Sequence, residues 1–411
     1  MRRAGSRWQA AVSGLRGFID KIKPTFSEGG KMAWLQSTFE AFETFAFTPN
    51  TTTRQGSHIR DAIDMKRSMI TVVIALMPAL LFGMWNIGWQ HFSLIGGQSS
   101  FWSCFAFGLV RMLPLIAVSY IVGLAIEFAF AQIRHHEVNE GFLVTGLIIP
   151  MIVPVTVSLW QLALAVAFAV VIGKEVFGGT GMNFLNPALV ARAFLFFAYP
   201  THMSGDSVWT AAKWWGTDAI AGATPLGEMM GGGIRPSASL LDMFVGTVAG
   251  STCETSAIAI LIGAIILLGS GIASWRIMLS VFVGGGAMGL LFNLIGASSY
   301  MQLPFYYHYV MGGFMFGAVF MATDPVTSAQ TNIGKWIYGL LIGLFAVLLR
   351  VVNPAYPEGM MLSILLMNCF APLIDHCVVA ANISRRKKRW VRARTGPSVS
   401  RQQVAGSNKD I

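Results

Sequence analysis

A glycine-rich loop carries the densest set of polar groups between two apolar runs of the chain. It covers residues 178–187 and reads Gly-Gly-Thr-Gly-Met-Asn-Phe-Leu-Asn-Pro. Glycine lets backbone approach a ligand closely, Asn183 and Asn186 offer amide donors and acceptors, and Pro187 suits the first turn of a following helix. The loop could therefore cap a helix, coordinate an ion or bind the edge of a planar heterocycle. Its spacing is neither a Walker A nor a Rossmann fingerprint.

Three carboxylates lie inside or at the ends of apolar runs. Glu127 stands within VGLAIEFAFAQ, Asp324 precedes a proline in MATDPVT, and Asp375 stands in PLIDHCVV. A carboxylate in an apolar helix is costly and is a functional candidate by default, although Glu127 could instead reach toward the membrane surface. Asp324 and Asp375 could hold a small cation together with freed carbonyls, or could simply cap a neighbouring helix.

The composition indicates a polytopic membrane protein. The 411 residues are 54% hydrophobic and only 12% charged, whereas soluble proteins carry about 25% charged residues. Ten apolar runs are long enough to suggest membrane spans. They lie near 69–88, 107–130, 141–157, 159–173, 187–200, 256–274, 277–296, 309–323, 336–352 and 359–379. The third and fifth are short and lie at prolines, so we expect them to be broken or tilted.

The two halves of the chain repeat the same pattern. Gly141-Phe142 leads to Pro154-Val155-Thr156, and Gly313-Phe314 leads to Pro325-Val326-Thr327. A charged residue and an Asn-Pro-Ala follow in each half: Lys174 with residues 186–188, and Arg350 with residues 353–355. Paired, proline-interrupted segments point to a site between related halves. With five spans in each half, the sequence predicts an all-α protein of ten transmembrane helices in two inverted five-helix repeats.

Charge sets the expected topology and the domain limits. Of the 29 Lys and Arg residues, eleven lie in residues 1–67 and nine lie after residue 384, which predicts that both termini are cytoplasmic. A basic tail beside a span is more simply a topology signal and a contact for anionic lipid than a nucleic-acid site. No secretory signal peptide is expected. The predicted units are a cytoplasmic arm (1–67), a first repeat (68–200), a periplasmic loop (201–255), a second repeat (256–380) and a basic cytoplasmic tail (381–411). The four cysteines show no metal-binding spacing, so no metal site is expected.

Several long motifs resemble a known family. GGTGMNFLNPALVARAFLFFAYP, the GAT before Pro225, MATDPVT and RVVNPAYPEGMM resemble the B subunit of the bacterial sodium-translocating NADH:quinone oxidoreductase. The resemblance covers nearly the whole chain. The related D subunit of the Rnf complex shares the architecture, but the long N-terminal arm and HEVNEGF favour the first family.

The resemblance implies two flavins and a third redox partner. It implies an FMN joined through its phosphate to Thr224, a residue that the local sequence alone describes as a turn residue, with attachment by a separate flavin transferase. The family's attachment motif begins with Ser or Thr, whereas this chain has Ala221. It also implies a non-covalent riboflavin bound by Asn183 and Asn186, and ubiquinone as the electron acceptor.

The resemblance further implies a quinone site and a cation pathway. The family's quinone site involves the N-terminal arm and the second span, and we assign Gly123, Glu127, Phe194 and Phe196 to it. Family members often have Gly-Gly where this chain has Gly123-Leu124, which bears on pocket shape. Asp324 and Asp375 match acidic residues implicated in cation uptake.

These expectations combine into one functional hypothesis. The chain would be a bacterial inner-membrane component of a six-subunit oxidoreductase that passes electrons from FMN to riboflavin to ubiquinone and couples this to transport of Na⁺ or H⁺. NADH would be oxidised on another subunit, because no nucleotide-binding fingerprint is present here. The alternatives are a D subunit of the Rnf type and a stand-alone inverted-repeat channel or transporter without flavin.

Overall fold

A computed structural model describes most of the apolar part of the chain. The described residues are 65–95, 100–134, 141–205, 208–210, 223–233, 235–353 and 359–395, with a few isolated residues before 58. Almost all of the predicted arm, the end of the basic tail, and Asp218, Ala221 and Gly222 lie outside them. Every regular element among the described residues is helical.

The helices follow the ten predicted apolar runs. The first half contains α3 (Met65–Ile95), α4 (Phe101–Arg134), α5 (Phe142–Ile152), α6 (Leu159–Val171), η2 (Glu175–Phe177), α7 (Pro187–Ala198) and α8 (Pro200–Met203). Two short helices, α9 (Pro225–Met230) and α10 (Leu240–Val245), follow in the connecting loop. The second half contains α11 (Ala257–Gly269), α12 (Trp275–Ile295), α13 (Tyr307–Val310), α14 (Phe314–Phe316), the π-helix η4 (Gly317–Met321), α15 (Asn332–Val352) and α16 (Gly359–Thr395).

Six helices in the described part of the chain are long and apolar enough to cross a membrane. They begin at Met65, Phe101, Leu159, Trp275, Asn332 and Gly359, and the one from Leu159 continues through η2 to Phe177. The apolar helices α5, α7 and α11 have only 11, 12 and 13 residues, fewer than the roughly 20 residues that a full span requires. Helix α5 stops because Val153 is extended (ψ 159°) before Pro154, the conformation that a following proline imposes.

The helices pack through small residues in both halves. Helix α4 contacts α3, α5 and α6, while α15 contacts α12 and α16. A side chain at Gly108 would collide with the backbone of Met84 on α3, and one at Gly343 would collide with the backbone of Val281 on α12. Such close approach between helix backbones is typical of membrane helix pairs. Between the halves, α3 lies against α11, and α7 contacts α16.

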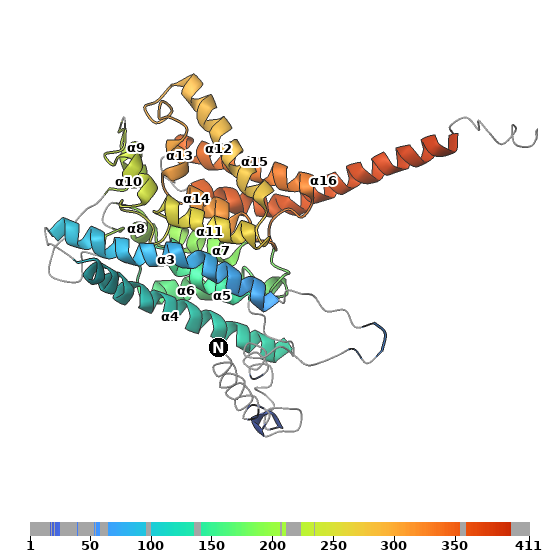
Figure 1. The fold of residues 1–411 in the computed structure, drawn as a ribbon, viewed down its shortest axis with the longest axis horizontal. Coiled ribbons are helices and arrows are strands. Elements are labelled where there is room, and N and C mark those ends of the chain that lie inside the picture. The colour runs from blue at the N-terminus through green and yellow to red at the C-terminus, as the bar shows by residue number, and fades with distance from the viewer. Residues whose placement is uncertain are drawn as a thin grey trace, which may run out of the picture.

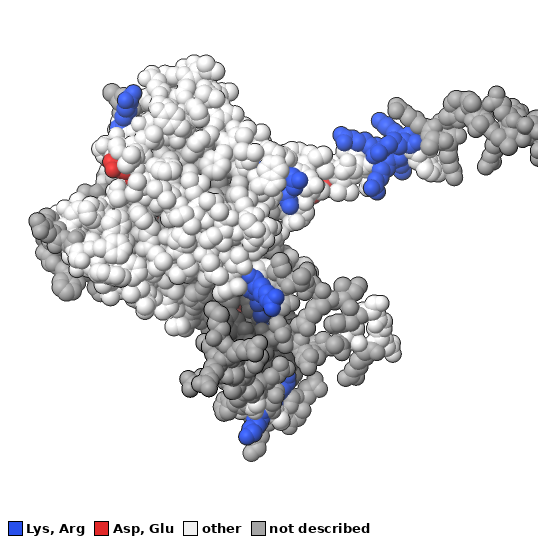
Figure 2. Space-filling view, viewed as in Figure 1, with Lys and Arg blue, Asp and Glu red and all other residues white. Residues whose placement is uncertain are grey.

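One helix extends well beyond the body of the molecule. Helix α16 has 37 residues, about 55 Å at 1.5 Å per residue, and its second half projects away from the bundle (Figure 1). Its exposed end carries the basic run Arg385–Arg389, whereas the body facing the viewer in Figure 2 shows very few charged side chains. The basic run therefore lies on the part of α16 that extends out of the apolar body of the molecule.

Candidate functional site

Two cavities lie at opposite ends of the helix bundle. The first, which we name the asparagine cavity, has a volume of about 140 Å³. The starts of α3, α5 and α7 meet there with the ends of α11 and η4. Its polar lining residues are Ser68, Thr145, Lys174, Thr180, Asn183, Asn186, Thr323 and Asp324. The structure therefore brings together the two predicted riboflavin residues and one of the two predicted cation residues.

The two asparagines each keep one polar atom available to the asparagine cavity. Asn183 Nδ2 donates to Leu185 O (2.9 Å), and Asn186 Oδ1 accepts from Ala188 N (3.0 Å), which caps α7. The other amide atoms, Asn183 Oδ1 and Asn186 Nδ2, take part in neither of these bonds, although the two residues are only 7% and 6% exposed. A buried amide normally satisfies its polar atoms. One acceptor and one donor that line the same cavity suit a ligand whose edge presents both a hydrogen-bond donor and an acceptor.

The glycines of the loop serve its turns. Gly178, Gly179 and Gly181 all have positive φ, at 121°, 92° and 90°, a region that other residues rarely adopt. A side chain at Gly179 would face the Glu175 carboxylate, and the cavity lining contains none of the three glycines. Their contribution is therefore to fold the loop that places Asn183, and no close backbone approach to the asparagine cavity is seen at these glycines.

A buried ion pair adjoins the asparagine cavity, and its lysine forms part of the wall. Lys174, which follows α6, contacts the carboxylate of Glu127 on α4 through its Nζ atom. The two residues are 4% and 5% exposed. Lys174 Nζ also lies 5.9 Å from the centre of the Phe142 ring, and a side chain at Gly123 would collide with that same ring. Glu127 is therefore neither at the surface nor at a helix end: it is paired in the interior, one helical turn from Gly123.

Asp324 combines a turn role with a place in the asparagine cavity. Its carboxylate accepts hydrogen bonds from Val326 N (3.2 Å) and Thr327 Oγ1 (2.9 Å), and it lines the cavity beside Thr323. Both of the roles considered from the sequence, a cap for the following segment and a carboxylate facing a site, are compatible with this position.

Asp375 lies apart from both cavities. From α16 it accepts hydrogen bonds from Gln330 N (2.6 Å), Thr331 N (3.0 Å) and Thr331 Oγ1 (2.6 Å). Thr331 in turn caps α15 by accepting from Gly334 N. Asp375 thus holds the far end of the segment that begins at Asp324, and it connects this segment to α16.

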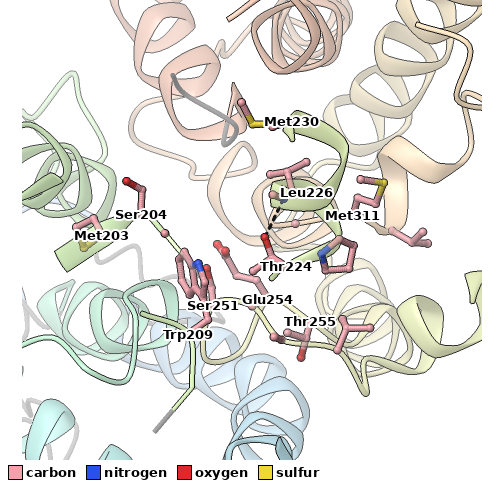
Figure 3. A pocket seen from close by; sticks show the side chains of 18 of the residues that line it. Met203, Ser204, Trp209, Thr224, Leu226, Met230, Ser251, Glu254, Thr255 and Met311 are labelled. Atoms are coloured by element: carbon pink, nitrogen blue, oxygen red, sulfur yellow. Dashed lines mark hydrogen bonds between the residues drawn. The ribbon is translucent and has the colours of Figure 1, made fainter. Parts of the chain in front are cut away.

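The second cavity, which we name the threonine cavity, has a volume of about 250 Å³ and contains Thr224 in its wall. Thr224 is half-buried and caps α9, because its Oγ1 accepts from Gly227 N (3.0 Å). Figure 3 shows Trp209, Glu254 and Thr255 lining the same cavity from other segments. Aromatic and thioether side chains complete the wall: Phe196, Met203, Met230 and Met311.

A second buried ion pair supports the threonine cavity. Arg192 on α7 donates to Glu254 Oε1 (3.0 Å) and Ser251 Oγ (3.2 Å), and Glu254 lines the cavity. Nearby, Arg350 Nη1 donates to His308 O (2.8 Å). Arg350 stands out in the sequence only as part of the repeat, and the pairing of Arg192 with Glu254 was not predicted, although a lone Arg192 within an apolar run is a signal that could have found it.

The four residues assigned to the quinone site do not converge. Gly123 lies against the Phe142 ring and Glu127 is paired with Lys174, whose Nζ lies over the same ring, whereas Phe196 lines the threonine cavity. Phe194 stacks on Phe168 at 4.7 Å in a separate apolar groove. Among the described residues, no three His, Cys, Asp or Glu side chains lie together as a metal site requires.

Comparisons with known proteins agree with the resemblance drawn from the motifs. A profile of the NQR2, RnfD, RnfE family matches residues 52–384. A relative from Stutzerimonas stutzeri, named as the B subunit of Na(+)-translocating NADH-quinone reductase, is 51% identical over 407 residues, covering 92% of this chain and 100% of the relative. Relatives with the same name from Azotobacter vinelandii and Chromohalobacter salexigens are 48% identical over 406 and 402 residues. They are matched over 100% and 97% of their length, and 92% of this chain is covered in both cases.

The profile match covers well over half of the chain, and the relatives match along almost its whole length. The chain therefore belongs to the NQR2, RnfD, RnfE family.

Proposed function

We propose that this chain is the membrane subunit of a Na⁺-translocating NADH:quinone oxidoreductase that holds two flavins and passes electrons to ubiquinone. The names of its relatives support the class of complex. The observation that carries the flavin assignment is the pair of cavities: Thr224 lines one, and Asn183 and Asn186 line the other with an available amide atom each. NADH oxidation belongs to another of six subunits, and a flavin transferase esterifies Thr224.

The donor sets suit the two proposed flavins. A riboflavin ring edge presents both carbonyl acceptors and an N–H donor, which match Asn186 Nδ2 and Asn183 Oδ1. Thr224 offers a hydroxyl for a phosphoester while Trp209 and Phe196 supply aromatic surface for the ring. Both cavities are smaller than the roughly 300 Å³ at which small-molecule pockets begin, so seating a whole flavin requires their walls to move apart. When bound, the flavins supply the one-electron chemistry, and the chain positions them and sets their electrostatic surroundings.

The packing supports two inverted repeats of five spans. Helix α3 begins at the asparagine cavity, whereas its counterpart α11 ends there. The two Gly-Phe segments behave likewise: α5 begins at that cavity, at Gly141, whereas η4, which follows Gly313-Phe314, ends there, near Phe320. Counterparts that run in opposite directions place equivalent sites at opposite faces of the bundle. We therefore propose that Thr224 faces the periplasm and that Asn183 faces the cytoplasm of a bacterial inner membrane, with both termini cytoplasmic.

The remaining residues complete the proposed path. Lys174 and Glu127 stand beside the riboflavin position, with Gly123 behind them, so a quinone site at the second span would adjoin this flavin. Asp324 shares the asparagine cavity and is positioned to couple a cation to the charge of the riboflavin. Asp375 connects to Asp324 through the segment between them.

In-gel ultraviolet fluorescence of the denatured protein from native membranes tests the function. We expect a fluorescent band that mass spectrometry assigns to the peptide containing Thr224. A dark band would remove the covalent flavin and favour a channel or transporter without flavin.

Two variants separate the anchor from the helix cap. Thr224→Ala removes both the hydroxyl and the cap, which costs about 0.5–2 kcal/mol of stability, and Thr224→Asn keeps a capping oxygen without a hydroxyl. We expect both to lose covalent FMN while the protein still assembles into the complex. Fluorescence that survives denaturation in Thr224→Asn would show that another residue carries the flavin.

A further inference from the structure

The two cavities share a feature that their predicted ligands do not explain. In each half, a buried cation lies over the phenylalanine of the Gly-Phe pair. Lys174 Nζ lies 5.9 Å from the ring centre of Phe142, and Arg350 Cζ lies 5.7 Å from that of Phe314. The two cations are 4% and 1% exposed. A cation near the end of the helix that follows the Gly-Phe segment therefore makes a similar contact in each half, at opposite ends of the bundle.

Each of these cations adjoins one cavity. Lys174 is itself a lining residue of the asparagine cavity. Arg350 stands directly behind the wall of the threonine cavity: a methyl group at Gly312, which lines that cavity, would lie 3.4 Å from Arg350 Nη2. A fixed cation in a site shielded from water acts more strongly on a neighbouring charge than it would in water.

Each cation is also held in place by a second group. Lys174 is paired with the buried carboxylate of Glu127, which does not line the asparagine cavity, so part of the lysine charge is balanced from behind the wall. Arg350 Nη1 donates to the backbone carbonyl of His308, which fixes the guanidinium beside Gly312. The charge that the asparagine cavity experiences therefore depends on Lys174 and Glu127 together.

We infer that Lys174 and Arg350 are positioning residues for the two flavins, and that their charge raises the reduction potential of the flavin at each cavity. This inference rests on the proposed function. Accepting an electron makes a flavin more negative, so a nearby cation stabilises the reduced form relative to the oxidised form. Glu127 acts through Lys174 by partly cancelling this effect at the non-covalent flavin.

The test is a spectroelectrochemical titration of the purified whole complex. Lys174→Met is expected to lower the midpoint potential of the non-covalent flavin, because it removes the cation and leaves the Glu127 carboxylate. Glu127→Gln is expected to raise that potential. The double variant Lys174→Gln/Glu127→Gln retains a neutral hydrogen-bonding pair and is expected to lie between the two, which guards against misfolding from an unpaired buried charge.

The second flavin provides an internal control. The Lys174 and Glu127 variants should leave the potential of the covalent flavin unchanged, whereas Arg350→Met should lower that potential and Arg350→Lys should largely preserve it. Potentials that do not move, or that move in the same direction in Lys174→Met and Glu127→Gln, would overturn the inference. Absence of both flavins from the wild-type complex would instead refute the proposed function itself.

Discussion

Asn186 carries two polar atoms with separate tasks. Its Oδ1 caps α7 by accepting from Ala188 N, while its Nδ2 is available to the asparagine cavity. A substitution that keeps the first atom and removes the second can therefore separate folding from binding.

We predict that Asn186→Asp retains α7 but binds the non-covalent flavin at least about fivefold more weakly. The carboxylate keeps the capping acceptor, but it removes a donor and adds a negative charge opposite a carbonyl edge, a loss of about 1–3 kcal/mol. Flavin released by acid from the purified complex and quantified by chromatography measures the effect. Covalent FMN on Thr224 serves as the control for correct maturation. Full riboflavin occupancy in Asn186→Asp would exclude a donor role for Nδ2.

Gly123 matters through the ring that lies against it. We predict that Gly123→Ala lowers the melting temperature of the complex and reduces quinone reductase activity, because a methyl group would collide with Phe142 and displace the ring over Lys174. Overpacking of this kind typically costs about 1–3 kcal/mol. The double variant Gly123→Ala/Phe142→Leu frees the space and should recover most of the melting temperature. A failure of the smaller side chain to rescue would argue against a steric cause.

At the scale of elements, the segment from Asp324 to Thr331 connects the asparagine cavity to α16. Asp324 fixes its first turn, and Asp375 accepts three hydrogen bonds at its end. A change at either carboxylate therefore affects the same segment.

We predict that Asp375→Asn weakens cation-stimulated turnover, because the neutral amide offers a poorer acceptor to the two N–H groups and to Thr331 Oγ1. Thr331→Ala removes only the hydroxyl contact and the α15 cap. If Asp375 has a purely structural role, Thr331→Ala should weaken cation-stimulated turnover about as much as Asp375→Asn does. If Asp375 takes part in cation uptake, Thr331→Ala should weaken it less. The measurement is quinone reductase activity as a function of Na⁺ concentration. If Asp375→Asn keeps the wild-type dependence, this carboxylate is only a connection between helices.

The elements that the sequence predicts best are those that depend on local pattern. Runs of apolar residues identify the helices outside the 201–255 loop, and Pro154 and Pro187 mark where α5 stops and α7 starts. The length of a helix is harder to predict from the sequence: α11 stops at Gly269 although the apolar run continues to 274. Partners across the bundle are harder still. Lys174 and Glu127 are 47 positions apart and Arg192 and Glu254 are 62 apart, and only the packing of separate helices determines that they meet.

In the candidate site, too, residue types can be recognised from the sequence, whereas the contacts between distant residues depend on the fold. Asn183, Asn186 and Asp324 were singled out separately for their residue types, and the fold brings all three to one cavity. Grouping Phe194 and Phe196 with Glu127 followed from the family resemblance and not from a local signal. On α7 these two rings point to different places, since residues two apart on a helix do not share a face.

At the scale of the whole molecule, the repeat and the charge distribution lead to the same orientation. In the proposed repeat, counterpart helices run in opposite directions. In the sequence, basic residues gather in residues 1–67 and after residue 384, and Figure 2 shows the second group on the projecting end of α16. The two cavities should therefore open toward different sides of the membrane, with the Thr224 segment on the side away from the basic run Arg385–Arg389.

Labelling with a membrane-impermeant maleimide tests this orientation. The four native cysteines are first replaced, because Cys369 and Cys377 are exposed. Single cysteines are then introduced at Arg235, exposed near Thr224, or at Met182, which is 71% exposed beside Asn183. We predict that Arg235→Cys reacts in intact spheroplasts and that Met182→Cys reacts only after the membrane is permeabilised. Retention of covalent flavin in both variants confirms that the labelled protein is mature. Equal labelling of both positions from one side would contradict five spans in the first half, because the fifth span, α7, lies between Met182 and Arg235 and must place them on opposite sides.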